Sequence, residues 1–283
     1  MPPIRKLKFD KIGYWSEIKL EIVRKYAAAY SRILSAQDRP RLRHVYIDAF
    51  AGAGIHISRT TGEFVSGSPL NALRIDPPFA EHYFIDLDSK KTNQLKKLAG
   101  HRVDVHILEG NCNKLMLDEI FPHVRYEDYR RALCLLDPYG LHLNWEVIRT
   151  AGEMRSIDMF LNFPVADMNR NVLWWNPQGV RDEDIQRMSA FWGDESWRNA
   201  AYGTEDEDLF GHRRPRKEDN EVIAESFCDR LKKVAGFSHV SAPLPMRNSR
   251  GATIYYLIFA SQKAVATHIV DEIFSNYRDH GSH

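Results

Sequence analysis

Cysteine, long apolar runs and excess charge of one sign are all scarce in this 283-residue sequence. The three cysteines (Cys112, Cys134 and Cys228) stand singly, without a Cys-x-x-Cys pair, which argues against a disulfide framework or a cysteine zinc site. No apolar run is long enough to span a membrane, and none follows the basic N-terminus as in a signal peptide. The formal net charge of +1 excludes a binder that depends on overall basicity.

These absences lead us to expect a soluble, cytoplasmic protein without a metal site and without a membrane partner. Hydrophobic residues make up 43% of the chain and charged residues 27%, which is ordinary for a folded protein and too apolar for a disordered one. Residues 281–283 have the look of an artificial addition, and no structural role is expected for them.

Short apolar runs bounded by Gly, Pro and Asp alternate with helical stretches through the middle of the chain. Strands are predicted at 44–50, 82–87, 103–108, 132–137 and 157–163, and helices at 69–75, 89–99, 113–120 and 144–153. Such alternation is typical of a parallel sheet covered by helices on both faces. A helix at 219–235, two strands at 237–246 and 252–260 joined by a turn at 248–251, and a helix at 263–277 follow. The sequence therefore predicts an α/β fold with a seven-stranded, mostly parallel sheet that ends in an antiparallel hairpin.

The chain divides into four parts on this pattern: a helical N-terminal extension (1–40), a first part of the core (41–165), an insertion or cap (166–218) and a C-terminal part of the core (219–280). Residues 1–50 carry eleven Lys/Arg against five Asp/Glu, consistent with a solvated helix face or with a nucleic-acid stripe. The insertion holds four of the six tryptophans, which could form a small local core or a base-stacking surface. Its stretch 203–218 is expected to be partly mobile.

Polar or small residues follow each of the first four predicted strands. The first strand ends in Asp48, and the glycines Gly52 and Gly54 after it would let the backbone approach a nucleotide-like ligand. About thirteen residues (55–67) then intervene before the helix that starts at Ser68-Pro69, and they form either a lid or a surface connection. After the second strand, Asp86 is placed to accept hydrogen bonds from the ribose hydroxyls of an adenosine, whereas Asp88 could simply cap a helix.

The third and fourth strands end in further candidate residues. Asn111 could reach the edge of an adenine, although an ordinary turn explains it nearly as well. Cys112 and Cys134 lack an evident base partner and are interpreted as small core residues rather than nucleophiles. After the fourth strand, Asp137 faces the crevice in which open α/β sheets bind ligands, Pro138 stiffens the turn, and Tyr139 offers a ring for stacking.

Taken in order, the segments DAFAGAG (48–54), DLD (86–88), GN (110–111) and DPY (137–139) resemble the class I S-adenosylmethionine-dependent methyltransferases. The resemblance implies a Rossmann-like fold, with S-adenosylmethionine bound and S-adenosylhomocysteine released. It places Gly52 and Gly54 under the methionine part, Asp86 on the ribose, Asn111 near the adenine and Asp137 toward the methyl acceptor. The residues expected to bind the cofactor are Asp48, Phe50, Ala51, Gly52, Gly54, Asp86, Leu87, Asp88, Asn111 and Cys112, and those expected to act in catalysis are Asp137, Pro138 and Tyr139.

A narrower resemblance is to the three-Cys-motif partner family, TcmP. It rests on Trp15 with Lys19-Leu20, and on the segments YIDAFAG (46–52), GSPL (67–70), FIDLD (84–88), LDPYG (136–140) and LNFP (161–164). This resemblance implies that a protein with a three-Cys motif is the partner of this chain.

The expected function is methyl transfer to DNA or RNA, with an exocyclic amine as one possible acceptor. Amine methyltransferases carry Asp or Asn, two prolines and then an aromatic residue, whereas the second proline is missing here at position 139. A flipped-out base would be needed in a duplex, and Asn169 and Arg170 could then contact phosphate, although they could equally be a polar loop start. A non-catalytic partner subunit and a small-molecule methyltransferase are the alternatives.

Overall fold

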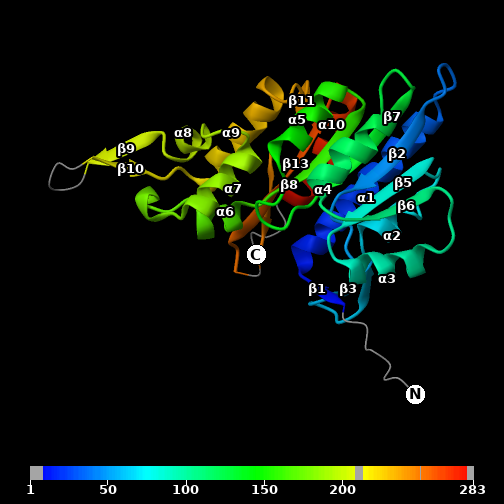
Figure 1. Ribbon diagram of the computed structural model, residues 1–283, viewed down its shortest axis with the longest axis horizontal. Coiled ribbons are helices and arrows are strands. Elements are labelled where there is room, and N and C mark those ends of the chain that lie inside the picture. Colours follow the sequence, from blue (N-terminus) through cyan, green and yellow to red (C-terminus); the bar gives the residue numbers. More distant parts are fainter. Residues whose placement is uncertain (1–8, 208–212, 249, 279–283) are drawn as a thin grey trace.

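The computed structural model describes residues 9–207, 213–248 and 250–278. A central sheet runs through them in the strand order β11-β13-β8-β7-β2-β5-β6, with β12 also paired to β13 (Figure 1). The five strands β8, β7, β2, β5 and β6 are mutually parallel, and β13 runs antiparallel to β8. The strands of this sheet are β2 (Arg43–Asp48), β5 (Glu81–Asp86), β6 (Val105–Glu109), β7 (Arg130–Leu136), β8 (Ile157–Phe163), β11 (His239–Val240), β12 (Leu244–Arg247) and β13 (Thr253–Ser261).

The expected α/β class, the parallel strands and the antiparallel C-terminal strand are confirmed. The strand count differs, because within the described residues the sheet has eight strands where seven are expected. The segment predicted as one strand at 237–246 is two short strands, β11 and β12, on the same edge of β13. Pro243 lies in the break between them, and a residue without an N–H cannot continue a ladder of hydrogen bonds.

Helices cover both faces of the sheet. Residues that alternate along each strand pack to opposite sides, so in β2 the Tyr46 side chain joins one hydrophobic cluster and Val45 and Ile47 join the other. The Tyr46 side is covered by α1 (Tyr14–Ser35), α2 (Ser68–Ala72), α3 (Ser89–Ala99) and α10 (Ala264–Arg278). The other side is covered by α4 (Cys112–Leu115), the π-helical and 3-10 turns Met116–Ile120 and Phe121–His123, α5 (Trp145–Met154) and α9 (Asn220–Lys233).

A separate three-stranded sheet is formed by residues near the N-terminus and the segment after β2. It consists of β1 (Asp10–Ile12), β3 (Ile55–Ser58) and β4 (Phe64–Ser66), with β1 parallel to β3 and β3 antiparallel to β4. The segment 55–67, expected as either a lid or a plain connection, is therefore a hairpin to which the start of the chain adds a strand.

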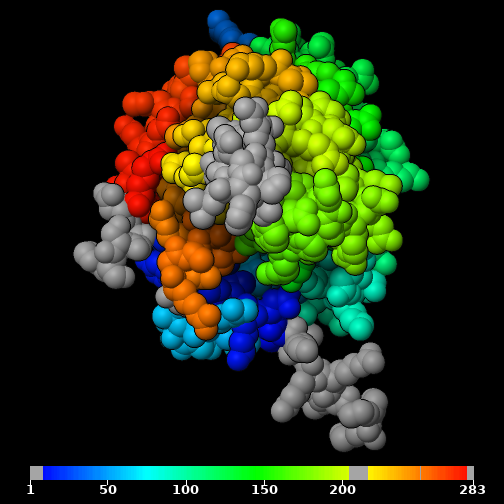
Figure 2. All heavy atoms as spheres, turned by 90° about the vertical axis from the view of Figure 1, so that its left-hand side faces the viewer, coloured from blue at the N-terminus to red at the C-terminus, as the bar shows by residue number. Residues whose placement is uncertain are grey.

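The insertion contributes short helices and a hairpin: α6 (Val165–Asn171), a 3-10 turn (Pro177–Gly179), α7 (Asp182–Trp192), α8 (Trp197–Ala201), β9 (Thr204–Glu207) and β10 (Arg213–Arg216). Trp192 and Trp197 are buried in the main core of the protein, so this pair forms neither a base-stacking surface nor a separate local core. Trp174 and Trp175 are exposed. Residues 208–212, in the stretch expected to be mobile, lie outside the described residues. Figure 2 shows the yellow-green insertion beside the orange C-terminal hairpin on one face of the molecule.

None of the helices in the described ranges is long and apolar enough to cross a membrane.

Close packing of α5 against the segment after α9 gives a test of this arrangement. A Cβ added at Gly152 would lie 2.0 Å from the Ala235 carbonyl oxygen, so we expect Gly152→Ala to destabilise the fold by about 1–3 kcal/mol through overpacking. Thermal unfolding should then shift down by roughly 2–4 °C per kcal/mol. Gly13→Ala is the control, because nothing lies within 4 Å of a Cβ there. An unfolding temperature for Gly152→Ala equal to that of the control would contradict the packing.

Candidate active site

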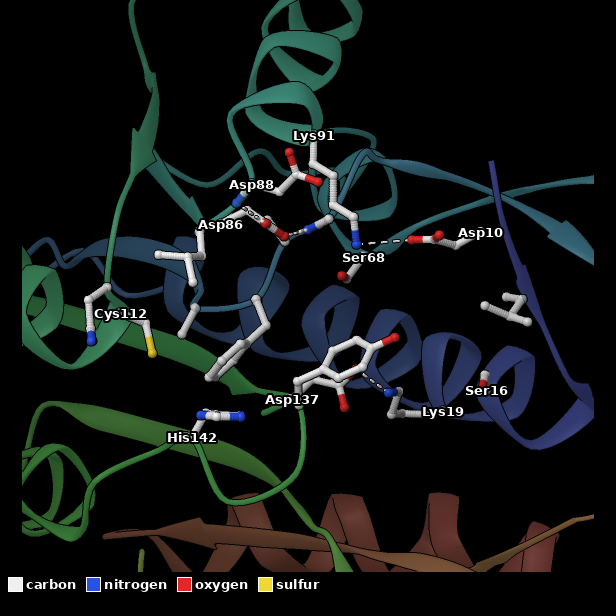
Figure 3. A pocket seen from close by; sticks show the side chains of 18 of the residues that line it. Asp10, Ser16, Lys19, Ser68, Asp86, Asp88, Lys91, Cys112, Asp137 and His142 are labelled. Carbon is white, nitrogen blue, oxygen red and sulfur yellow. Dashed lines mark hydrogen bonds and ion pairs between the residues drawn. The ribbon is translucent and has the colours of Figure 1, made fainter. Parts of the chain in front are cut away.

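A cleft of about 1130 Å³ opens at the carboxyl ends of β2, β5, β6 and β7 (Figure 3). Loops that follow parallel strands meet at this edge, which is where open α/β sheets bind their ligands. The cleft wall includes ten of the residues singled out in the sequence: Phe50, Ala51, Gly52, Asp86, Leu87, Asp88, Asn111, Cys112, Asp137 and Tyr139. Asp48, Gly54, Pro138, Asn169 and Arg170 are not part of the wall.

The loop after β2 turns sharply so that its backbone faces the cleft. Gly52 has a φ of +65° and Gly54 one of +81°, a region that other residues rarely adopt. Gly52 lines the cleft, whereas a Cβ at Gly54 would lie 2.8 Å from Leu95 Cδ1, so Gly54 serves the packing of α3. Gly54 is not part of the cleft wall, and its expected contact with a ligand stays a prediction.

Asp86 is hydrogen-bonded to the backbone of three of these loops. Its Oδ2 accepts a hydrogen bond from the Gly52 N–H at 2.9 Å, and its Oδ1 accepts one from the Asp88 N–H at 2.8 Å. The Asp86 carbonyl accepts a third hydrogen bond, from the Gly110 N–H at 3.1 Å. Each carboxylate oxygen can accept a second hydrogen bond, so Asp86 keeps capacity for hydroxyl donors in the cleft. Asp88 caps α3 by accepting from the Lys90 N–H at 2.8 Å, which bears out its interpretation as a helix cap.

The loop after β6 caps helix α4 and also lines the cleft. Asn111 Oδ1 accepts a hydrogen bond from the Asn113 N–H at 2.9 Å and starts α4. Cys112 is buried beside it, and burial raises the pKa of its thiol to about 11. Burial also raises the pKa of Cys134 well above its ordinary value. Both thiols are therefore protonated at neutral pH, consistent with core cysteines that are not nucleophiles.

Asp137, just after β7, has two partners that lie in the segments resembling the TcmP family but that the sequence did not pair with it. Lys19 of α1 forms an ion pair with Oδ2, and the Asn162 amide at the end of β8 donates to Oδ1 at 2.7 Å. The Lys19 ammonium also lies 5.2 Å from the centre of the Tyr255 ring, over its face. Figure 3 shows Lys19 and Asp137 pointing toward each other at the floor of the cleft.

Burial by itself lowers the pKa of Lys19, but the Asp137 carboxylate more than offsets this, and the pKa ends above its ordinary 10.5. Lys19 is therefore a buried ammonium at neutral pH. The sequence does contain a signal for it, because Trp15, Lys19 and Val23 follow one another at a spacing of four and all three are buried. A lysine within the apolar stripe of a helix needs a buried partner.

The loop after Asp137 presents an aromatic ring to solvent. Tyr139 is 84% exposed at the cleft, and Pro138 is buried. Gly140 follows with a φ of +57°, and a Cβ there would lie 2.6 Å from Asp167 Oδ2. The Asp167 carboxylate thus packs against this turn. Its Oδ1 accepts a hydrogen bond from the Asn171 amide at 3.0 Å.

Asn169 and Arg170 lie on α6 and not at a loop start. The Asn169 amide donates to Asn220 Oδ1 on α9 at 3.0 Å, and the Arg170 carbonyl accepts from the Trp174 indole at 2.9 Å. Both hydrogen bonds are made within the protein, one of them to α9, and neither residue lines the cleft.

The small N-terminal sheet closes another side of the cleft. Asp10 and Lys11 of β1, His56 of β3 and Arg59 just after it all line the wall. Asp10 forms an ion pair with Lys91 of α3 at 3.0 Å, which links the start of the chain to the loop that holds Asp86. Burial lowers the pKa of His56, so this side chain is neutral at pH 7, and its Nδ1 is buried without a hydrogen-bond partner among the described residues.

Comparison with known proteins gives information on the fold alone. No protein-family model matches the chain, and no curated protein does. Among solved structures, protein LPL1258 of Legionella pneumophila has a TM-score of 0.52 at 10% identity, over 95% of this chain and 94% of that chain. Two further structures are the methyltransferase domain of bacterial CtHen1 (TM-score 0.40, 10% identity, 85% of this chain and 99% of that chain) and an S-adenosylmethionine-dependent methyltransferase of Mesorhizobium loti (0.36, 12%, 83% and 97%).

The likeness to the first structure shows that this fold is shared over almost the whole length of both chains. Membership of the TcmP family is supported by no match and stays a prediction.

Asp48 gives a pH-dependent test of the packing beneath the cleft. The side chain is fully buried, which raises its pKa from 3.8 to about 7, while hydrogen bonds from Ser68 and the Phe50 N–H partly oppose the shift. An unfolded aspartate ionises at lower pH, so the contribution of Asp48 to stability is complete below about pH 4 and is lost as the pH rises to about 7. Asp48→Asn should therefore be more stable than the parent at about pH 8, by on the order of 2–4 kcal/mol, and equal to it at about pH 4.

Chemical denaturation at several pH values measures this difference. Asp38→Asn, which removes an exposed carboxyl, is the control. An Asp48→Asn variant that is less stable than the parent at both pH values would show that the carboxylate is not buried as described.

Proposed function

We propose that this protein is an S-adenosylmethionine-dependent methyltransferase. The observation that carries the proposal is the position of Asp86, whose carboxylate holds the backbone N–H groups of Gly52 and Asp88 at the edge of the cleft. This arrangement fits an adenosine, because a carboxylate at the end of the second strand is placed to accept hydrogen bonds from both ribose hydroxyls. When bound, S-adenosylmethionine would supply a methyl group on a positively charged sulfur.

The remaining contacts follow from the lining of the cleft. The Gly52 turn would approach the methionine part, since no side chain stands between its backbone and the cleft. Asn111 and Cys112 would border the adenine, and Leu87, which is 77% exposed, would cover one of its faces. Asp137 and Tyr139 lie farther along the same wall and would face the methyl acceptor.

We further propose that the acceptor belongs to a nucleic acid. Lys11, Arg59, Lys91 and Arg187 line the cleft, and cations of this kind contact phosphates. The exposed ring of Tyr139 beside them would stack on a base. The motifs shared with the TcmP family support a partner protein, which we propose to dock without contributing to cofactor binding.

The cofactor proposal predicts that Asp86→Ala weakens binding of S-adenosylhomocysteine by about 10- to 100-fold, because hydrogen bonds to a charged group are lost. Isothermal titration calorimetry of the purified protein measures this. In the parent protein, ligand at about a hundred times its dissociation constant should stabilise by about 2.7 kcal/mol in thermal unfolding. Asp118→Ala is the matched control, since Asp118 is an exposed carboxylate that does not line the cleft. Equal affinity in Asp86→Ala and Asp118→Ala would refute the assignment.

Stacking on Tyr139 predicts a second result. Tyr139→Ala should weaken binding of a single-stranded oligonucleotide by about 1–3 kcal/mol, whereas Tyr139→Phe, which keeps the ring, should bind as the parent does. Fluorescence anisotropy with a labelled oligonucleotide measures both. If removing the ring and removing only its hydroxyl weaken binding equally, the ring does not stack on a base.

A further inference from the structure

The Lys19–Asp137 pair bears on which kind of atom accepts the methyl group. It lies in the cleft wall beside Tyr139, and Asp137 keeps about 30% of its side chain exposed while Lys19 is almost fully buried. Because both residues line the cleft and form an ion pair, an acceptor that contacts Asp137 lies close to the Lys19 ammonium. The inference below rests on the proposed methyltransferase function and concerns the substrate of the same site.

Lys19 has hydrogen-bonding capacity to spare. An ammonium has three N–H donors, and within the described ranges the hydrogen bond recorded for Lys19 is the one to Asp137. The Tyr255 ring lies on another side of the ammonium, where it offers its π face and no lone pair. At least one donor is thus free to meet an oxygen of a bound molecule.

The Asp137 carboxylate likewise has unused hydrogen-bonding capacity. Lys19 occupies Oδ2 and the Asn162 amide occupies Oδ1, and each carboxylate oxygen can accept one more hydrogen bond. Asn162 is held at this place by β8, and its own Oδ1 is buried without a partner among the described residues. The cleft floor therefore offers a fixed acceptor beside a fixed cationic donor.

An exocyclic amine of a base does not suit this arrangement. Its nitrogen has one lone pair, which must attack the methyl group, and the nitrogen gains positive charge as it does so. A neighbouring ammonium opposes that charge. Donation from Lys19 to the nitrogen would also occupy the lone pair that has to react.

A hydroxyl group suits it well. Its proton can be donated to Asp137, one lone pair of the oxygen can accept from Lys19, and the second lone pair stays free for attack. As the proton leaves, the oxygen gains negative charge, which the ammonium stabilises. The same two side chains that disfavour an amine thus orient and activate a hydroxyl.

We propose that the methyl acceptor is a hydroxyl oxygen held between Lys19 and Asp137, and that in the nucleic-acid substrate it is the 2′-hydroxyl of RNA. The oxygen forms a bond to the methyl carbon while the carbon–sulfur bond breaks, and the bonding pair stays on sulfur as a neutral thioether. The hydroxyl proton passes to Asp137 and then to water in the cleft. RNA is the substrate because DNA carries no 2′-hydroxyl.

Two measurements on the full chain test this directly. The first uses S-adenosylmethionine with a labelled methyl group and random-sequence RNA and DNA libraries of equal length, followed by digestion to nucleosides and mass spectrometry. We expect label in RNA, as 2′-O-methylnucleosides, and none in DNA. Label on a base nitrogen or carbon, equal label in DNA, or no label in RNA overturns the proposal.

The second measurement does not depend on turnover. In the presence of S-adenosylhomocysteine, an RNA oligonucleotide should bind at least about fivefold more tightly than the DNA of the same sequence, because the 2′-hydroxyl contacts charged groups. Lys19→Met should abolish this preference, whereas Lys11→Met, which also removes a cleft cation, should weaken RNA and DNA alike and keep it. A preference that survives in Lys19→Met contradicts the role of Lys19.

Folding and cofactor binding are controlled separately. If Lys19→Met does not fold, the double variant Lys19→Met/Asp137→Asn removes both buried charges together and is tested in its place. Intact binding of S-adenosylhomocysteine with no 2′-O-methylation means that the hydroxyl assignment fails and the methyltransferase proposal stands. If the parent protein does not bind S-adenosylhomocysteine, the methyltransferase proposal itself fails.

Discussion

The ion pair between the buried Lys19 and the partly exposed Asp137 is the interaction on which the arrangement of the site depends. It joins the first helix to the end of a central strand, and through Asn162 to the next strand. Burying two charges costs several kcal/mol per ion, which their attraction offsets only when geometry and hydrogen bonding are good. Apolar residues of the same size would usually stabilise a fold equally well, so stability alone does not explain a charged pair at the floor of a cleft.

The rest of the cleft is organised by parallel strand ends. Because β2, β5, β6 and β7 are neighbours in the sheet and run in the same direction, their following loops converge. Asp86 fixes the relative positions of three of these loops by accepting backbone hydrogen bonds, and the small N-terminal sheet adds the far wall. In the function that we propose, ligand recognition by Asp86 and methyl acceptance beside the ion pair would occupy adjacent parts of one edge of the sheet.

Much of this was accessible from the sequence, because the relevant signals are local. Apolar runs that end in Gly or Asp predict both the parallel strands and the residues at their ends, and Asp88 as a helix cap follows from the same spacing. Long-range pairings were not accessible. The start of the chain joins the hairpin at 55–67 as a strand through hydrogen bonds between backbones, which leave no pattern in the side chains. Lys19 pairs with Asp137 across 118 positions, and neither its place in an apolar helical stripe nor its place in a family motif identifies that partner.

The experiment closest to the central claim is a crystal structure of the protein with S-adenosylhomocysteine. The account predicts that the ribose hydroxyls donate to Asp86, that the adenine lies beside Asn111, and that the sulfur faces the Lys19–Asp137 pair. A ligand bound elsewhere, or bound in this cleft with its sulfur directed away from Asp137, would contradict the account.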